Sequence, residues 1–184
     1  MSGKKCLVTG ASRGIGKSIV KRLLEAGSIV VATASTDEGL KALKLEFSCF
    51  GDNLMIIKSD LSLQPEVELL CESVTDVVGE IDVLINNAGI LCLESLQNSS
   101  DELLRKSFEV NFFSAFTLSR YFARAMVSNK NGSIINVCSS SAYTGGGGPE
   151  HSIYASTKHA LLGFSRALDE ELRTHNIRVG TGSP

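Results

Sequence analysis

Two side chains, Tyr154 and Lys158, have types and spacing that could move a proton. They lie four residues apart in a segment of helical pattern, so both are expected on one face of a helix. An ammonium group beside a phenol stabilises the phenolate, which lets the phenol release and take back a proton near neutral pH. Such a pair also arises by chance, so the surrounding residues must decide whether it is a catalytic unit.

Hydroxyl and amide side chains are predicted to lie near this pair. Three serines follow directly on an apolar, strand-like run at residues 133–138: Ser139, Ser140 and Ser141. A hydroxyl there can donate a hydrogen bond to a substrate oxygen as charge develops on it, although serines also simply terminate strands. Asn111 interrupts a helical segment, and because asparagine is a poor helix former it indicates either a functional amide or a buried, hydrogen-bonded one.

The first strand-like run, residues 5–9, leads into a turn that contains three glycines. Without Cβ atoms, glycines allow a tight turn, a close approach of a pyrophosphate to the following helix, and close packing of that helix on a sheet. Their spacing, G-x-x-x-G-x-G, differs from the G-x-G-x-x-G fingerprint, and an ordinary tight turn is the alternative. The position at the first strand-to-helix junction favours a phosphate site formed by Gly10, Ser12, Arg13, Gly14, Ile15 and Gly16.

The end of the second strand-like run predicts which dinucleotide binds. An acidic residue there would hold the ribose 2′-hydroxyl of NAD and repel the 2′-phosphate of NADP, but residues 32–36 contain no carboxylate. Arg13 can pair with a phosphate, and Ser35 and Thr36 can donate hydrogen bonds to it. The sequence therefore favours NADP(H), with an Arg13 that merely faces solvent as the alternative.

The fourth strand-like run ends in small and amide residues. Its last residue, Asn86, is followed by Asn87, Ala88 and Gly89. Small residues at the carboxyl end of a parallel strand would let a cofactor lie against the backbone. We therefore expect Asn87, Ala88 and Gly89 to contact the cofactor.

Short apolar runs that alternate with helical segments must position these residues. We predict strands at residues 5–9, 28–34, 54–58, 82–86, 133–138 and 177–181, and helices at residues 15–26, 37–47, 64–78, 101–128 and 152–175. Regular alternation predicts a parallel sheet covered by helices on both faces. The predicted fold is thus a single α/β domain over residues 1–184, doubly wound and Rossmann-type, with six strands in the order 3-2-1-4-5-6. Ligands bind such sheets at the carboxyl ends of the strands, where the glycine run at residues 145–148 is predicted to be a mobile loop.

Composition argues against several classes of protein. The 184 residues are 43% hydrophobic and 21% charged, with a net charge of −2, which predicts no nucleic-acid or membrane partner. No apolar run approaches the roughly 20 residues of a membrane span. The five cysteines are odd in number, scattered and without C-x-x-C spacing, which argues against a disulfide framework or a zinc site. With no secretion signal visible, we expect a cytoplasmic protein that acts on small molecules.

These motifs, in this order, resemble those of the short-chain dehydrogenase/reductase family. The similarity extends over the whole chain. It rests on residues 9–16, Asp60 and Leu61, residues 86–89, Asn111, Ser139, Tyr154, Lys158 and residues 178–184.

The resemblance implies an oxidoreductase that interconverts a carbonyl and an alcohol by hydride transfer with a nicotinamide cofactor. In this family pattern Tyr154 is the acid/base and Ser139 is the hydroxyl that orients the carbonyl. Lys158 holds the nicotinamide ribose and eases proton release from Tyr154, and Asn111 anchors a proton-relay water.

The resemblance also bears on the adenine site, the substrate and the assembly. It implies that Asp60 and Leu61 lie at the adenine, that no metal takes part, and that the protein forms a homodimer or homotetramer. Residues 33–35 and the general run of the sequence are similar to bacterial 3-oxoacyl-[acyl-carrier-protein] reductases. A 3-oxoacyl thioester is therefore the leading substrate expectation.

Two features depart from the family pattern. Tyr154 comes fifteen positions after Ser139, slightly more than is usual, which leaves Ser140 or Ser141 as alternative catalytic serines. Family members continue past Pro184 into a substrate loop, a helix and a last strand, so we expect this chain to be part of a longer protein, with an unprotected last strand and little turnover of its own. A non-catalytic NADP-binding sensor or scaffold is the alternative function, and the intact Ser, Tyr, Lys and Asn set argues against it.

Overall fold

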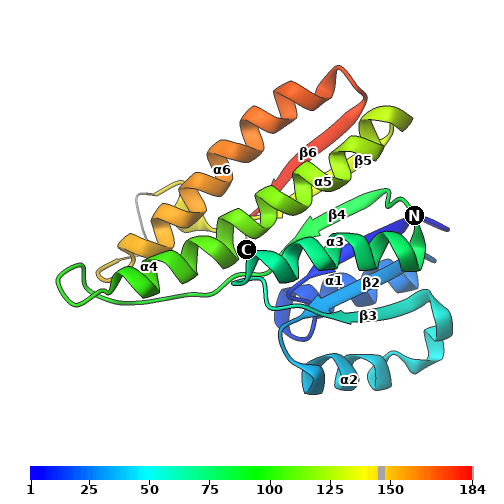
Figure 1. Cartoon of the computed structure of the whole chain (residues 1–184), viewed down its shortest axis with the longest axis horizontal. Helices are drawn as coiled ribbons and strands as arrows, with labels where there is room; N and C mark the ends of the chain where they lie inside the picture. Colours follow the sequence, from blue (N-terminus) through cyan, green and yellow to red (C-terminus); the bar gives the residue numbers. More distant parts are fainter. Residues whose placement is uncertain (145–147, 184) are drawn as a thin grey trace.

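The computed structural model describes residues 1–144 and 148–183, and its centre is one parallel sheet (Figure 1). The strands are β1 (Lys5–Thr9), β2 (Ile29–Ala34), β3 (Leu54–Lys58), β4 (Val83–Asn86), β5 (Gly132–Val137) and β6 (Ile177–Gly182). Their order is β3-β2-β1-β4-β5-β6, and each neighbouring pair is parallel. The predicted doubly wound fold and strand order are confirmed.

Helices follow the strands as the periodicity predicts, with one difference. They are α1 (Gly14–Glu25), α2 (Asp37–Glu46), α3 (Gln64–Val78), α4 (Asp101–Phe108), α5 (Ser114–Asn129) and α6 (Ser152–Arg173), with short 3₁₀ segments η1 (Ser48–Asn53) and η3 (Ser140–Ala142). The single helix predicted at residues 101–128 is instead α4 and α5 joined by a π-helical segment, η2 (Glu109–Phe113). Such a segment has a wider turn, and Asn111 lies inside it.

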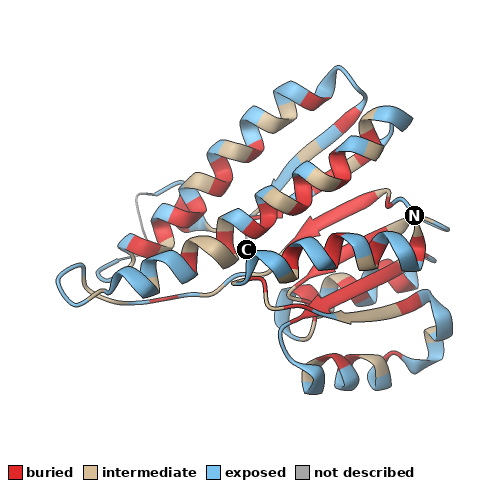
Figure 2. Cartoon of the chain, in the orientation of Figure 1, coloured by how far each residue is buried: buried red, intermediate tan, exposed pale blue. Residues whose placement is uncertain are grey.

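Side chains that alternate along the strands build a core on each face of the sheet. Leu7 and Leu84 pack with residues of α3, α5 and α6, whereas Val8 and Ile85 pack with residues of α1 and α2. Because successive strand residues point to opposite faces, neighbours in the chain divide between the two cores. Figure 2 shows the resulting burial of the central strands.

The parallel register brings the carboxyl ends of the strands to one edge of the sheet. Thr9 pairs with Thr33, and Asn86 pairs with Asn136. The segments that follow β1, β2, β3, β4 and β5 therefore leave the sheet close together, as expected for a ligand crevice in this class of fold.

The outer edge of β6 differs from its prediction. The Val179 amide on this edge donates to Asp169 Oδ1 at 3.1 Å, and Asp169 also accepts from Arg173 at 2.6 Å. The expectation that nothing protects this edge is wrong at this position, because α6 packs along β6 and brings a carboxylate to the backbone.

Several expectations concern what the chain does not contain. Within residues 1–144 and 148–183, no helix is both long enough and apolar enough to cross a bilayer. Over the same ranges, no three His, Cys, Asp or Glu side chains gather in the way that metal ligands do. The five cysteines are unbridged, and Cys49 alone among them is exposed. Most of the glycine run predicted as a mobile loop, residues 145–147, lies outside the described residues.

Candidate active site

A cleft of about 470 Å³ lies where β1, β2, β3 and β4 end. Apart from Thr36, the residues predicted to hold phosphate, 2′-phosphate or adenine line it, together with the residues predicted after strand four: Gly10, Ser12, Arg13, Gly14, Ile15, Gly16, Ser35, Asp60, Leu61, Asn87, Ala88 and Gly89. The structure thus brings together segments that are far apart in the sequence. Tyr154 and Lys158, which were also predicted to contact the cofactor, are not among the residues that line this cleft.

The glycines of the turn after β1 are there for different physical reasons. Gly10 and Gly14 have φ angles of 62° and 55°, in the left-handed region that other residues adopt at a cost. Gly16 has an ordinary helical backbone, but a Cβ on it would lie 2.2 Å from the Gly10 carbonyl oxygen. Only glycine lets α1 start this close to the turn, which keeps the helix N-terminus open toward the cleft.

Side chains at the ends of β1 and β4 join the two walls of the cleft. Thr9 Oγ1 accepts from the amides of Asn87 and Ala88, each at 3.0 Å. Asn87 Nδ2 donates to the main-chain oxygen of Thr9 at 2.9 Å and to that of Gly10 at 3.1 Å. The side chain of Asn87 is therefore engaged in shaping the cleft, while its neighbours present backbone to the open space.

Polar and basic side chains line the part of the cleft at the carboxyl end of β2. Arg13 and Ser35 are exposed and line it. Thr36 was also considered as a hydrogen-bond donor to the phosphate. Its hydroxyl oxygen accepts from the Gly39 amide at 3.4 Å, so Thr36 caps α2. The nearest acid along the chain, Asp37, forms an ion pair with Lys58 at 3.5 Å.

Asp60 supplies the carboxylate of the cleft. Its Oδ1 accepts from the Ser62 amide at 2.9 Å and from the Ser62 hydroxyl at 2.7 Å. These two hydrogen bonds hold the pKa of Asp60 below its usual value, and the positive charge of Lys106 acts in the same direction. Asp60 is therefore ionised at neutral pH and can accept further hydrogen bonds.

Five residues that line the cleft were missed from the sequence: Ala34, Ser59, Ile90, Lys106 and Val110. Ala34 and Ser59 follow the rule that strand ends face the ligand, so that rule could have found them. Lys106 and Val110 are four residues apart, hence on one helical face, but nothing in the sequence showed that this face meets the cleft.

Lys158 is a buried cation beside Tyr154. Only 3% of the lysine is exposed, and its Nζ donates to the Val137 oxygen at 2.8 Å. The same Nζ lies 5.9 Å from the centre of the Tyr154 ring. Burial lowers the pKa of Lys158 from its ordinary value of 10.5, because removal from water disfavours the charged form.

Asn111 lies next to Ile90, which lines the cleft, and its side-chain amide is held by protein groups. Its Oδ1 accepts from the Ile90 amide at 2.8 Å. Its Nδ2 donates to the Ile90 oxygen at 2.9 Å and to Thr157 Oγ1 at 3.0 Å. A Cβ on Gly89 would lie 3.4 Å from both Asn111 Oδ1 and Lys158 Nζ, so these two polar groups flank the bare backbone of Gly89.

Of the three serines after β5, Ser139 and Ser141 are hydrogen-bonded to each other. Ser139 is half-buried, and its Oγ accepts from the Ser141 amide at 3.2 Å and donates to Ser141 Oγ at 3.3 Å. Ser140 is exposed and Ser141 is buried. Ser139 thus combines an accessible hydroxyl with a fixed orientation, whereas the buried Ser141 supports it.

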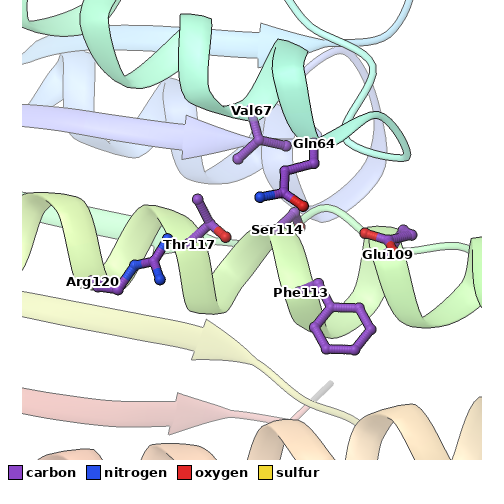
Figure 3. Close-up of a pocket in the computed structure, with 7 residues that line it drawn as sticks. All are labelled: Gln64, Val67, Glu109, Phe113, Ser114, Thr117 and Arg120. Carbon is purple, nitrogen blue, oxygen red and sulfur yellow. The ribbon is translucent and has the colours of Figure 1, made fainter.

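A second cleft, of about 290 Å³, lies between α3 and α5 (Figure 3). Gln64 and Val67 come from α3, and Thr117 and Arg120 come from α5. None of the predicted site residues lines it.

Comparison with known proteins agrees with this geometry. The family model described as short chain dehydrogenase matches residues 4–184. The chain is 36% identical over 182 residues to a protein of Escherichia coli named 3-oxoacyl-[acyl-carrier-protein] reductase FabG, covering 99% of this chain and 72% of that protein. It is 34% identical over 184 residues to Nodulation protein G of a Rhizobium species, covering 100% and 73%.

Solved structures of short-chain oxidoreductases have the same fold as this chain. A metagenomic short-chain oxidoreductase in complex with NADP superimposes with a TM-score of 0.93 at 34% identity, covering 100% of this chain and 82% of that one. A short-chain alcohol dehydrogenase described from Sinorhizobium meliloti superimposes with a TM-score of 0.91, also at 34% identity, covering 98% and 71%. Sequence and structure agree that this chain belongs to the short-chain dehydrogenase family.

Proposed function

We propose that the protein is an NADP(H)-dependent oxidoreductase that interconverts a carbonyl and a secondary alcohol, with Tyr154 as the acid/base. The observation that carries this proposal is the burial of Lys158 beside Tyr154, next to Gly89 at the edge of the cleft. A buried ammonium group is expensive unless it is paired, and within residues 1–144 and 148–183 Lys158 forms no salt bridge. Such an arrangement is typical of a functional site.

A dinucleotide fits the residues of the cleft. Gly10 and Gly16 leave the space that a pyrophosphate needs at the start of α1. Asp60 and Leu61 would hold the adenine, Gly89 would lie against the nicotinamide end, and Lys158 would hold the nicotinamide ribose. When bound, the nicotinamide ring supplies or accepts the hydride.

The chain's own residues would handle the proton and the substrate oxygen. Tyr154 gives its phenolic proton to the carbonyl oxygen during reduction and takes it back during oxidation. The positive charge of Lys158 stabilises the phenolate that remains. Ser139 would turn its hydroxyl proton, which here donates to Ser141 Oγ, toward the substrate oxygen, with Ser140 and Ser141 as its alternatives. The side-chain NH₂ group of Asn111 already donates to the Ile90 main-chain oxygen and to Thr157 Oγ1. Asn111 would therefore bind the relay water through its other polar atoms.

Replacement of Tyr154 by Phe tests this assignment. It removes the proton-transfer hydroxyl alone, so turnover should fall by about 100-fold or more while NADPH affinity stays within about twofold. NADPH oxidation with a panel of ketones and acetoacetyl thioesters, followed at 340 nm, measures the first quantity, and fluorescence titration of NADPH measures the second. A variant that keeps a tenth of the original rate would refute the role of Tyr154.

The preference for NADP(H) follows from the residues at the carboxyl end of β2 and in the turn after β1. Arg13 and Ser35 can hold a 2′-phosphate, and Ala34 stands where a carboxylate would repel it. We expect NADPH to bind at least about tenfold more tightly than NADH, about 1.4 kcal/mol, and Ala34→Asp to reverse the order. Equal dissociation constants for the two cofactors in the unaltered protein would contradict this preference.

The substrate proposal rests on the comparisons. Several relatives at 32–36% identity are named 3-oxoacyl-[acyl-carrier-protein] reductases. A 3-oxoacyl thioester carries a ketone that Tyr154 could protonate, so it is the substrate we propose. Activity on plain ketones with none on acetoacetyl thioesters would count against it.

Self-association is proposed through α5 and α6. Phe113, the last residue of η2, and Phe116 on α5 are 46% and 37% exposed, and the Phe116 ring lies 5.2 Å from that of the half-buried Phe164 on α6. Grouped aromatic residues that are exposed are typical of protein interfaces. Light scattering after size-exclusion chromatography should show a dimer or tetramer, and Phe116→Glu should shift it toward monomer.

The alternative function is that of a non-catalytic sensor or scaffold, which would bind NADP in the cleft and catalyse no hydride transfer. It predicts binding of NADPH by titration with no oxidation by any carbonyl compound. The buried Lys158 beside Tyr154 favours the enzyme, because a protein that only binds has no use for an assisted phenol.

A further inference from the structure

Thr157 lies between Tyr154 and Lys158 on α6, and its side chain is completely buried. We propose that the Thr157 hydroxyl is a positioning group, which fixes Tyr154 and Lys158 by joining their turn of α6 to Asn111. The inference rests on the proposed function, since it concerns how the acid/base is held. Thr157 would not itself touch the substrate or the cofactor.

The hydroxyl of Thr157 connects two partners with short hydrogen bonds. Its Oγ1 accepts from Asn111 Nδ2 at 3.0 Å and donates to the Tyr154 main-chain oxygen at 2.7 Å. A hydroxyl has one donor proton, and here that proton is used on the residue that carries the phenol. The two hydrogen bonds of Thr157 Oγ1 therefore connect the π-helical segment to the first turn of α6.

The other side of the network reaches the cofactor cleft. Asn111 holds the Ile90 amide and carbonyl at 2.8 and 2.9 Å, and Ile90 follows Gly89, whose backbone faces both Asn111 and Lys158. One asparagine thus ties α6 to the loop after β4. Because buried hydrogen-bond networks fix geometry more strictly than apolar packing does, loss of the Thr157 link should let Tyr154 and Lys158 shift relative to Gly89.

The same helix contains a second link of the same chemistry, away from Tyr154. Ser165 Oγ accepts from Asn136 Nδ2 at 2.8 Å and donates to the Leu161 oxygen at 2.6 Å, and both side chains are buried. Removal of either hydroxyl leaves a buried asparagine amide without one acceptor, so the loss of stability should be similar. Only the Thr157 link lies at the catalytic residues, which makes Ser165 a matched control.

The test compares Thr157→Val, Thr157→Ser and Ser165→Ala in the full chain, with NADPH and the most active carbonyl compound of the panel. Thr157→Val should lower kcat by about tenfold or more, since small misplacements of reacting groups are costly. It should weaken NADPH binding by about threefold, because Lys158 moves with its turn, and should change the pH profile of kcat. Thr157→Ser keeps the hydroxyl and should retain kcat within about threefold.

Ser165→Ala should lower the midpoint of thermal unfolding about as much as Thr157→Val while keeping kcat and NADPH affinity within about twofold. Equal losses of kcat in Thr157→Val and Ser165→Ala, or no recovery in Thr157→Ser, would overturn the inference. Should Thr157→Val not fold, Thr157→Ala removes the same hydroxyl and must give the same pattern. An unaltered protein that binds NADPH but turns nothing over would overturn the proposed function first, and the positioning role of Thr157 with it.

Discussion

Substitution of Gly16 by Ala tests whether close packing, and not backbone strain, requires glycine at the start of α1. The residue has a helical backbone, so alanine by itself would gain about 0.5–1 kcal/mol in helix propensity. Against this, the added methyl would lie 2.2 Å from the Gly10 oxygen and 2.5 Å from Asn87 Nδ2. The Gly10 oxygen belongs to the backbone, and Asn87 Nδ2 is held by hydrogen bonds to the main-chain oxygens of Thr9 and Gly10, so overpacking here costs about 1–3 kcal/mol.

The net expectation for Gly16→Ala is a loss of up to about 2.5 kcal/mol, from the difference between these two terms. In a chain of this size that corresponds to a fall of up to roughly 10 °C in Tm. NADPH affinity should fall by about tenfold or more, because displacement of the Gly10 carbonyl and Asn87 distorts the cleft that both line.

A matched control is available in Gly163, a helical glycine of α6 with nothing within 4 Å of a built Cβ. Gly163→Ala should raise stability by about 0.5–1 kcal/mol and leave NADPH affinity unchanged. Scanning calorimetry and fluorescence titration measure both variants. If Gly16→Ala were as stable as Gly163→Ala and bound NADPH like the unaltered protein, the packing argument would be wrong.

Two further predictions concern titration and thiol reactivity. The pKa of Lys158 is lowered by burial from 10.5, so the folded protein holds this proton less tightly than the unfolded chain, and stability should rise with pH between the lowered pKa and 10.5. Urea unfolding from pH 7 to pH 10.5 should show this rise relative to Lys158→Met, and parallel curves for the two proteins would contradict it. Iodoacetamide should label Cys49 alone in the native protein at pH 8, because burial raises the pKa of Cys6 to about 11 and of Cys71 to about 12, and Cys92 and Cys138 are also buried. Mass spectrometry should find one adduct, and a second would show that the native state opens.

The sequence by itself determined the fold and the location of the cleft that we propose for the cofactor. The alternation of apolar strands and helical segments predicted a parallel, doubly wound sheet, because parallel strands need crossover connections of one hand. The order of the six strands followed from taking this sheet as Rossmann-type. Twelve of the residues predicted to contact the cofactor line the cleft, and Thr36, Tyr154 and Lys158 do not. The twelve lie directly after strands, where local pattern and the rule for strand ends are sufficient to place them.

Only the tertiary structure decided how the polar groups are connected. The sequence left open whether Asn111 was functional or a satisfied buried amide, and its hydrogen bonds to Ile90 and Thr157 depend on a π-helical segment that no periodicity predicted. Lys106 and Thr157 were missed because their roles depend on which side of a helix meets another segment. Such contacts join residues distant in the chain, and they become visible only when packing fixes the rotation of each helix against the sheet.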